Sequence, residues 1–279
     1  MDDIKNFLCL YHANCADGFG AAWAVRHALG NIVDFHPAKY GLPPPDVTDR
    51  DLIIVDFSYP CDTLREMAKL AASILVLDHH KTALEDLQPL LEDGIVLGTF
   101  DMDKSGAMLA WEHFNPHQAP PALLRHIEDR DLWRFELAGT LEIQAALFSY
   151  PYDFQVWDQL MATDTEILRR DGAAISRKHT KDVHELIDAA AYRIIIAGHD
   201  VPVLNAPYFH SSEAGHAMGA GEPFAACYYD TEHHRVFSLR SDKDGMDVSE
   251  IAAGFGGGGH QHAAGFRLAH DELQRLASC

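Results

Sequence analysis

Short apolar runs alternate with helix-like segments along the first part of this 279-residue chain. The run at 51–56 is continuously apolar between its two aspartates, which indicates a strand buried on both faces. Regular alternation of strands and helices is typical of a parallel, doubly wound sheet. We therefore predict an N-terminal α/β domain of this kind. Its expected strands are Phe7–Tyr11, Ile32–Phe35, Asp51–Asp56, Ser73–Asp78 and Ile95–Leu97, with a helix at Cys61–Ala72.

The pattern changes twice further along the chain. Residues 105–190 favour helices only, and the long amphipathic stretch at its end is expected to connect two domains. Beyond it, short strands with Gly- and Asp-rich connections return, which predicts a smaller α/β domain. The expected division is an N-terminal domain at 1–165, a helical connector at 166–190 and a C-terminal domain at 191–279.

Charge limits the kinds of partner that we expect. The chain has 42 acidic and 22 basic side chains, a formal net charge of −20. Proteins that hold long nucleic acids are usually basic, because phosphate contacts supply much of the affinity. We therefore expect no long nucleic acid partner. A phosphate substrate would be small, or held where metal ions reverse the local field.

Cysteine usage and hydropathy favour the cytoplasm. Five cysteines, an odd and scattered set, fit reduced thiols better than a disulfide framework. No stretch approaches the ~20 apolar residues that cross a membrane. The first five residues also lack the pattern of a signal peptide, so we expect no membrane partner. The cysteines are Cys9, Cys15, Cys61, Cys227 and Cys279.

Acidic and imidazole side chains follow three of the predicted strands. The carboxyl ends of parallel strands meet at one edge of a sheet, so these groups should converge. One aspartate after a strand is commonly a turn or cap residue, and a histidine pair is commonly solvated, but three such coincidences favour a metal site. Two ions ~3.5–4 Å apart would activate water and neutralise a phosphoryl oxygen. The residues are His12, Asp17, Asp56, Asp78, His79 and His80.

Residues 75–81, with the sequence LVLDHHK, resemble the signature of the DHH phosphoesterases. Further segments resemble the other motifs of that family, in the same order and over nearly the whole chain. The similarity is greatest to oligoribonuclease-type phosphodiesterases with a glycine-rich C-terminal domain. These segments are 12–19, 54–56, 105–107, 127–133 and, for the glycine-rich signature GGGGHQHAAGF, 256–266.

The resemblance implies a hydrolase that binds two divalent ions, commonly Mn²⁺, with Mg²⁺, Fe²⁺ and Zn²⁺ as alternatives. It assigns catalytic roles to Asp56, which would bridge both ions, and to His80, which would face the substrate phosphate. Many relatives have an aspartate where this chain has Cys15, which is either an additional ligand or a bystander. The implied metal ligands are His12, Asp17, Asp56, Asp78, His79 and Asp129, with Asp131 as the alternative to Asp129.

The C-terminal domain is expected to bind the substrate. Four successive glycines at 256–259 let the backbone approach an anion closely, although a flexible linker is the alternative. An arginine after a strand in a chain poor in cations suits a phosphate anchor, with a surface ion pair as the alternative. The predicted substrate-binding residues are His80, Ser105, Arg240, Ser241, Gly257, Gly258, Gly259 and His260.

These observations predict a divalent-metal-dependent phosphodiesterase. It would hydrolyse short oligonucleotides, or cyclic or linear dinucleotides, to nucleoside monophosphates by metal-activated water. One alternative is a pyrophosphatase or polyphosphatase of the same superfamily. Another is a catalytically silent nucleotide-binding sensor, which the cysteine in the first motif keeps open. Chain length, polarity of attack and oligomeric state stay open.

Overall fold

The computed structural model describes residues 6–277, which divide into two compact units. Unit 1 comprises Met1–Ser176 and unit 2 comprises Arg177–Cys279. The division falls inside α8 (Thr165–Ala190), the helix that covers the predicted connector. The expectation of no signal peptide concerns residues 1–5, which lie outside the described residues, as does Cys279.

Unit 1 contains a five-stranded sheet in which every neighbouring pair of strands is parallel, so the predicted fold class is confirmed. The strand order is β2-β1-β3-β4-β5. It reverses between β1 and β3, and such switch points are where parallel sheets bind ligands. The strands are β1 (Phe7–His12), β2 (Val33–Ala38), β3 (Asp51–Val55), β4 (Ser73–Asp78) and β5 (Leu97–Phe100).

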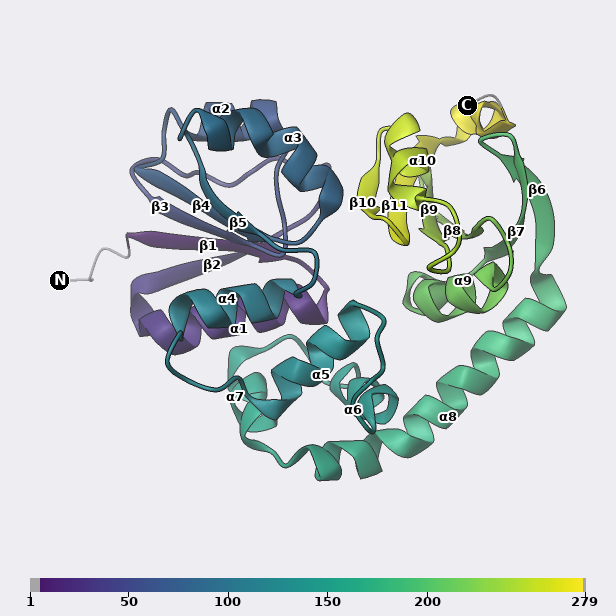
Figure 1. Ribbon diagram of the computed structural model, residues 1–279, viewed down its shortest axis with the longest axis horizontal. Coiled ribbons are helices and arrows are strands. Elements are labelled where there is room, and N and C mark those ends of the chain that lie inside the picture. Colours follow the sequence, from purple (N-terminus) through teal and green to yellow (C-terminus); the bar gives the residue numbers. More distant parts are fainter. Residues whose placement is uncertain (1–5, 278–279) are drawn as a thin grey trace. The chain divides into compact units, whose positions relative to one another are not determined.

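Helices cover both faces of this sheet, as a doubly wound fold requires (Figure 1). One face carries α1 and α4, and the other carries α2 and α3. After a short 3₁₀ turn, η1 (Gly30–Ile32), the chain enters β2. The helices are α1 (Ala16–Leu29), α2 (Cys61–Met67), α3 (Lys81–Glu92) and α4 (Gly106–Phe114).

Two predicted elements have different bounds in the structure. Helix α2 ends at Met67 rather than Ala72, because the next residues turn back: Leu70 O accepts from Asp49 N, and Ala72 N donates to Arg50 O. Strand β5 begins at Leu97, where the predicted strand ended. The preceding two residues still donate backbone hydrogen bonds to Leu90 O at the end of α3.

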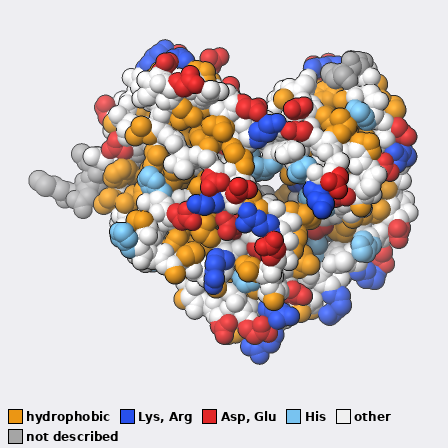
Figure 2. Space-filling model, in the orientation of Figure 1, with side chains coloured by type: hydrophobic (Ala, Val, Ile, Leu, Met, Phe, Trp, Pro, Cys, Tyr) orange, Lys and Arg blue, Asp and Glu red, His pale blue; other side chains and the backbone are white. Residues whose placement is uncertain are grey.

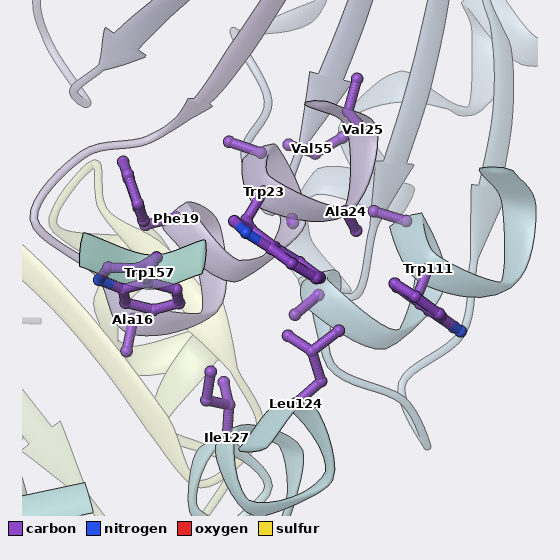
Figure 3. Packing of buried hydrophobic residues seen from close by; sticks show 14 of the residues in the cluster. Ala16, Phe19, Trp23, Ala24, Val25, Val55, Trp111, Leu124, Ile127 and Trp157 are labelled. Carbon is purple, nitrogen blue, oxygen red and sulfur yellow. The ribbon is translucent and has the colours of Figure 1, made fainter. Parts of the chain in front are cut away.

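A dense aromatic core joins α1 to the helices that follow the sheet (Figure 3). Trp23 stacks on Trp111 with ring centroids 6.0 Å apart, and Phe19 meets Trp157 edge-on at 4.9 Å. Residues 105–190 contain helices and no strand, as predicted. These additional helices are α5 (Ala122–Asp131), α6 (Thr140–Leu147) and α7 (Phe154–Ala162).

Unit 2 is built on a six-stranded mixed sheet with the order β10-β11-β9-β8-β7-β6. Only β7 and β8 are parallel neighbours, and the other pairs are antiparallel. The strands are β6 (Tyr192–Ile196), β7 (His199–Asn205), β8 (Ala225–Asp230), β9 (His234–Arg240), β10 (Gly258–His260) and β11 (Ala263–Ala269).

Part of the glycine segment at 256–259 contributes a strand to this sheet. Gly258, Gly259 and His260 form β10, which pairs with β11. A Cβ atom at Gly257 would lie 2.1 Å from the carbonyl oxygen of Gly265, so the glycine permits this close backbone approach. The helices of unit 2 are α9 (Ser211–Gly219), α10 (Val248–Gly254), η2 (Tyr208–His210) and η3 (His270–Ala277).

The described surface mixes acidic, basic and apolar side chains on the face drawn in Figure 2. Within residues 6–277, no helix has both the length and the apolar character needed to cross a membrane. Buried apolar side chains form clusters inside each unit.

Candidate metal centre

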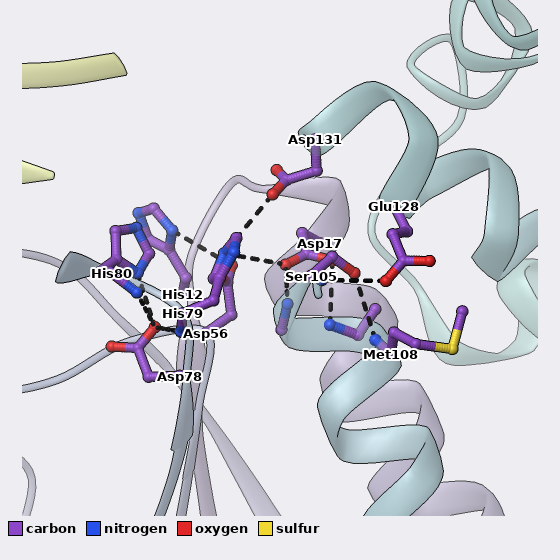
Figure 4. A network of polar contacts seen from close by, with 12 residues as sticks. His12, Asp17, Asp56, Asp78, His79, His80, Ser105, Met108, Glu128 and Asp131 are labelled. Carbon is purple, nitrogen blue, oxygen red and sulfur yellow. Dashed lines mark hydrogen bonds and ion pairs between the residues drawn. The ribbon is translucent and has the colours of Figure 1, made fainter. Parts of the chain in front are cut away.

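The ends of β1, β3 and β4 bring acidic and imidazole side chains to one edge of the unit 1 sheet (Figure 4). Asp56, directly after β3, has a positive φ of 52°, which is unusual for a side chain other than glycine. A Cβ atom at Gly106 would lie 2.5 Å from Asp56 Cβ, so α4 can begin beside it only with glycine there. The positive φ of Asp56 and the glycine at the start of α4 thus both contribute to the position of the Asp56 side chain.

Asp56 stands between two histidines. Its Oδ1 lies 3.1 Å from His79 Nε2, and its Oδ2 lies 3.5 Å from His12 Nδ1. The residue is 1% exposed, and Oδ2 accepts no hydrogen bond from the described residues. Its two oxygens therefore face different imidazoles, which is the arrangement expected of a carboxylate shared by two ions.

Two further carboxylates surround His79. The Nε2 atom lies 3.6 Å from Asp17 Oδ2 and 3.5 Å from Asp131 Oδ2. Asp17 is fixed by the start of α4, because its oxygens accept from the backbone amides of Gly106 (2.6 Å) and Ala107 (3.0 Å). Helix amides at an N-terminus favour a negative charge at this position.

Asp129, our preferred ligand from the fourth motif, points elsewhere. Its carboxylate accepts hydrogen bonds from Glu136 N (2.8 Å), Leu137 N (3.1 Å) and Thr140 Oγ1 (2.5 Å). Residues two apart on a helix differ in direction by about 200°, so only one of the two aspartates can face the cluster. The structure brings Asp131 to the cluster, and Asp129 holds the turn into α6.

Asp78 lies behind His80. Its Oδ1 is 2.6 Å from His80 Nδ1 and accepts from the backbone amide of His79 at 2.8 Å. Asp78 is fully buried, and its Oδ2 accepts no hydrogen bond from the described residues. A carboxylate at Nδ1 fixes the orientation and the tautomer of an imidazole.

The pKa values record a surplus of negative charge in the cluster. Burial, together with the charges of Asp131 and Asp56, raises the pKa of Asp17 well above its usual value. Burial opposes ionisation of Asp56 too, but the neighbouring imidazoles of His12 and His79 outweigh it and hold the Asp56 pKa well below its usual range. Burial likewise lowers the pKa of His79, yet these carboxylates raise it to about 10. A proton on His79 thus supplies positive charge that a divalent ion would replace.

The donor atoms meet the basic requirement of a metal site. Within each of three groups, one ligand atom per residue lies within 4.8 Å of the others. Carboxylate and imidazole, with one thiol, form a donor set that suits divalent transition metals. The groups are His12, Cys15 and Asp56; Asp17, His79 and Asp131; and Asp56, Asp78, His79 and His80.

Ser105, predicted to touch substrate, has a partner inside the protein. It is fully buried and caps α4, where its hydroxyl accepts from Met108 N at 3.3 Å. Its hydrogen bond to Asp17 also favours the ionised carboxylate, against the larger effects that raise the pKa of Asp17. These contacts give Ser105 a positioning function beside the cluster.

The predicted binding residues of unit 2 gather at one end of its sheet. Ala263 is the register partner of Arg240 on one side and of His260 on the other. The Arg240 guanidinium donates to Ser212 Oγ and to Leu239 O, both at 2.8 Å. Ser241 is buried and donates to Met246 O at 2.7 Å, so its hydroxyl also serves the local fold.

Sequence reasoning missed Tyr40, which lies on the loop after β2. Its ring centroid is 5.5 Å from that of His12, 4.6 Å from Phe57 and 6.5 Å from His80. The residue as a whole is nevertheless 48% exposed. No motif or periodicity marks this loop, because the contact arises only from the parallel pairing of β2 with β1.

No family model matches the chain. It is 29% identical over 288 residues to an uncharacterized protein of Acanthamoeba polyphaga mimivirus, covering 92% of this chain and 66% of that protein. It is 24% identical over 304 residues to oligoribonuclease NrnB of Bacillus subtilis, covering 96% of this chain and 74% of NrnB. The chain thus spans about two thirds to three quarters of the length of these curated relatives.

Comparison with solved structures shows which fold the chain has. The DHH domain of a protein described as a member of a ribosomal-protein family aligns over 98% of this chain and 84% of its own, with a TM-score of 0.61 and 13% identity. The chain has the DHH fold. RecJ of Thermus thermophilus, solved in complex with Mn²⁺, aligns over 98% of this chain and 51% of its own (TM-score 0.54, 14% identity).

Another structural neighbour is the pGpG-specific phosphodiesterase PggH of Vibrio cholerae. It aligns over 98% of this chain and 96% of its own, with a TM-score of 0.50 and 15% identity. The resemblance to DHH phosphoesterases, predicted from motif order, is confirmed by these comparisons. The prediction of a hydrolytic phosphoesterase agrees with the named relatives of this fold.

Proposed function

We propose that this protein is a divalent-metal-dependent phosphodiesterase that hydrolyses short oligonucleotides or dinucleotides to nucleoside monophosphates. The observation that carries the proposal is the position of Asp56, whose two oxygens face His79 and His12 at 3.1 and 3.5 Å. The similarity to NrnB and PggH supports the substrate class. The net charge of −20 favours a short substrate over a long strand.

We assign two ion positions to this centre. Asp56 would be shared, with His12 on one side and with Asp17, His79 and Asp131 on the other. Bound divalent ions supply an activated water and neutralise charge on the phosphoryl oxygens. Mn²⁺ is the ion we expect first, and the RecJ complex supports it. Mg²⁺, Fe²⁺ and Zn²⁺ suit the same donor atoms.

His80 would hold the reacting phosphate. Burial lowers the pKa of its imidazole, but the Asp78 carboxylate outweighs burial and raises it above the usual value. A protonated ring donates from Nε2, and its Nδ1 is held by Asp78 at 2.6 Å. This geometry suits a charge-assisted hydrogen bond to a phosphate oxygen.

Unit 2 would bind the rest of the substrate. Arg240 and His260 lie at the same level of its sheet, next to the backbone of Gly259, and suit a distal phosphate. Tyr208 and Phe209 in η2 are 56% and 59% exposed, and exposed rings of this kind stack on nucleobases.

The described cysteines are all free, which is consistent with a cytoplasmic enzyme.

A substrate panel tests the proposal. Metal-supplemented protein is incubated with di- to decanucleotides, cyclic dinucleotides, a nucleoside 3′,5′-bisphosphate and pyrophosphate. We expect nucleoside monophosphates from the shortest substrates and falling rates with length. Phosphate released from pyrophosphate alone would favour a pyrophosphatase. Binding of a dinucleotide without turnover under every metal would favour a nucleotide sensor.

A matched pair of variants links turnover to the centre. Asp56→Asn removes the shared charge and tolerates the positive φ, because asparagine adopts this conformation more readily than most residues. We expect the turnover rate to fall at least ~100-fold. Asp62→Asn, on the exposed side of α2, is the control and should retain full activity. Equal activities of the two variants would contradict the proposed centre.

A further inference from the structure

We propose that the Cys15 thiolate is a ligand of one metal position, together with His12 and Asp56. This position would take a thiophilic divalent ion such as Zn²⁺, Fe²⁺ or Co²⁺ in preference to Mg²⁺. The inference rests on the proposed metal centre and adds to it a chemical difference between its two halves.

The first observation is the position of the sulfur. The Cys15 Sγ, a ring nitrogen of His12 and a carboxylate oxygen of Asp56 lie within 4.8 Å of one another. A cation placed among the three atoms would be within reach of all of them after small side-chain rotations. Cys15 is half-buried and lies between the end of β1 and the start of α1.

The second observation comes from Asp56. Its Oδ2, the oxygen on the His12 side, is buried and accepts no hydrogen bond from the described residues. A buried carboxylate oxygen without a donor is unfavourable, since its desolvation is not compensated. A cation bound by Cys15 and His12 would supply that compensation.

Cys15 is a poor cap for the helix that follows it. It occupies the N-cap position of α1, but its side chain makes no capping hydrogen bond. Helices prefer Ser, Thr, Asp or Asn at this position because those side chains accept from the first amides. The Gly18 amide meets only a sulfur here, which is a weak acceptor, so metal binding is a better use of this side chain than capping.

The two halves of the centre differ in donor chemistry. The group of Asp17, His79 and Asp131 offers oxygen and nitrogen only, which suits Mn²⁺ or Mg²⁺. The group with Cys15 adds a soft sulfur, which selects Zn²⁺, Fe²⁺ or Co²⁺. Among the described cysteines, no other one belongs to a group of potential metal ligands.

Cobalt absorption tests this assignment on the full chain. Metal-free protein is titrated with Co²⁺, whose visible d–d bands report binding and whose near-ultraviolet charge-transfer band reports a thiolate ligand. We expect both signals in the unaltered protein. Cys15→Ser should lose the charge-transfer band and keep d–d bands. Cys61→Ser, which changes another half-buried cysteine, is the control and should keep both.

The outcomes separate this inference from the proposed function. Bands of the d–d type without charge transfer in the unaltered protein would overturn the role of Cys15 and leave the metal centre intact. Absence of all cobalt bands, with no ion retained after dialysis, would contradict the metal centre itself.

Two further measurements avoid reliance on one variant. In the unaltered protein, Zn²⁺ should slow alkylation of Cys15 by iodoacetamide at least ~10-fold and leave Cys61 unaffected. Equal alkylation with and without Zn²⁺ would count against ligation. Cys15→Asp should lower the ratio of Zn²⁺ to Mn²⁺ affinity at least ~10-fold, measured by calorimetric titration. An unchanged ratio would contradict the proposed selectivity.

Discussion

The Nδ1 atom of His80 lies 2.6 Å from Oδ1 of the fully buried Asp78. The same oxygen accepts from the backbone amide of His79, so one carboxylate orients two consecutive histidines at the end of β4. His80 therefore has a fixed ring plane and a raised pKa, with burial opposing and Asp78 favouring protonation. The orientation and the pKa of His80, the third residue of the DHH motif, therefore depend on Asp78, the first residue.

This relationship predicts a shifted pH profile in Asp78→Asn. The neutral amide no longer stabilises protonated His80, so the ring loses its proton at lower pH. If protonated His80 holds the phosphate, the alkaline limb of the kcat profile should move to lower pH. The measurement is kcat between pH 6 and about 9 at saturating metal. His80→Gln should remove the limb, and an unchanged profile in Asp78→Asn would refute the coupling.

Asp129 and Asp131 should differ in what they support. Asp131→Asn is expected to weaken metal binding ~10–100-fold with little change in Tm. Asp129→Asn should instead lower the free energy of unfolding by about 1–3 kcal/mol, because an amide cannot replace a carboxylate that accepts three hydrogen bonds. Calorimetric metal titration and urea denaturation measure the two effects. Equal metal affinities in the two variants would exclude Asp131 as a specific ligand.

Arg240→Lys should raise KM more than it lowers kcat. The lysine keeps the charge but loses the planar guanidinium, which suits two-point contact with phosphate. A contact that is equally strong in the ground state and in the transition state affects KM rather than kcat. We expect KM to rise ~10-fold. Arg235→Lys, near the other end of β9, is the control and should leave KM unchanged. A fall in kcat alone would place Arg240 in the chemistry.

Acid should destabilise the protein through His216. Burial, together with the positive charge of Arg240, lowers the pKa of this imidazole to about 4. The unfolded chain takes up the proton near pH 6.5 and the folded protein only near pH 4. Between these values the unfolded state binds more protons, so the free energy of unfolding falls by up to about 1.4 kcal/mol per pH unit.

Urea denaturation at several pH values between 7.5 and 4.5 checks this effect. His216→Gln should show a weaker loss of stability below about pH 6.5 than the unaltered protein. Parallel pH dependences in the two proteins would rule out His216 as the source.

Gly257→Ala should disrupt the edge strand of unit 2. The added Cβ would lie 2.1 Å from the Gly265 carbonyl oxygen, so β10 must move. We expect the free energy of unfolding to fall by about 1–3 kcal/mol and amide hydrogen exchange in β10 to become faster. Gly254→Ala is the control, because no atom lies within 4 Å of its added Cβ. Equal stability of both variants would contradict the packing of β10.

The sequence predicted the sheet of unit 1 well because its signal is local. Continuous apolar runs mark strands buried on both faces, and alternating helices require parallel pairing. The position of Asp56 followed from the same reasoning, since a carboxylate directly after β3 must lie at the carboxyl edge.

Other features depend on contacts that no local pattern contains. The choice between Asp129 and Asp131 is decided by the backbone amides of Glu136 and Leu137, which a turn brings to Asp129. The strand at Gly258–His260 was missed because glycines disfavour strands, and only the close approach to Gly265 makes them necessary.

The register of β11 has a practical consequence. Ala263 faces Arg240 on one neighbour and His260 on the other, so a one-residue slip of this strand would separate the two side chains from their common level. If Arg240 and His260 hold a distal phosphate as we propose, the length of β11 sets the spacing of the two side chains, and deletions or insertions in this strand should weaken substrate binding.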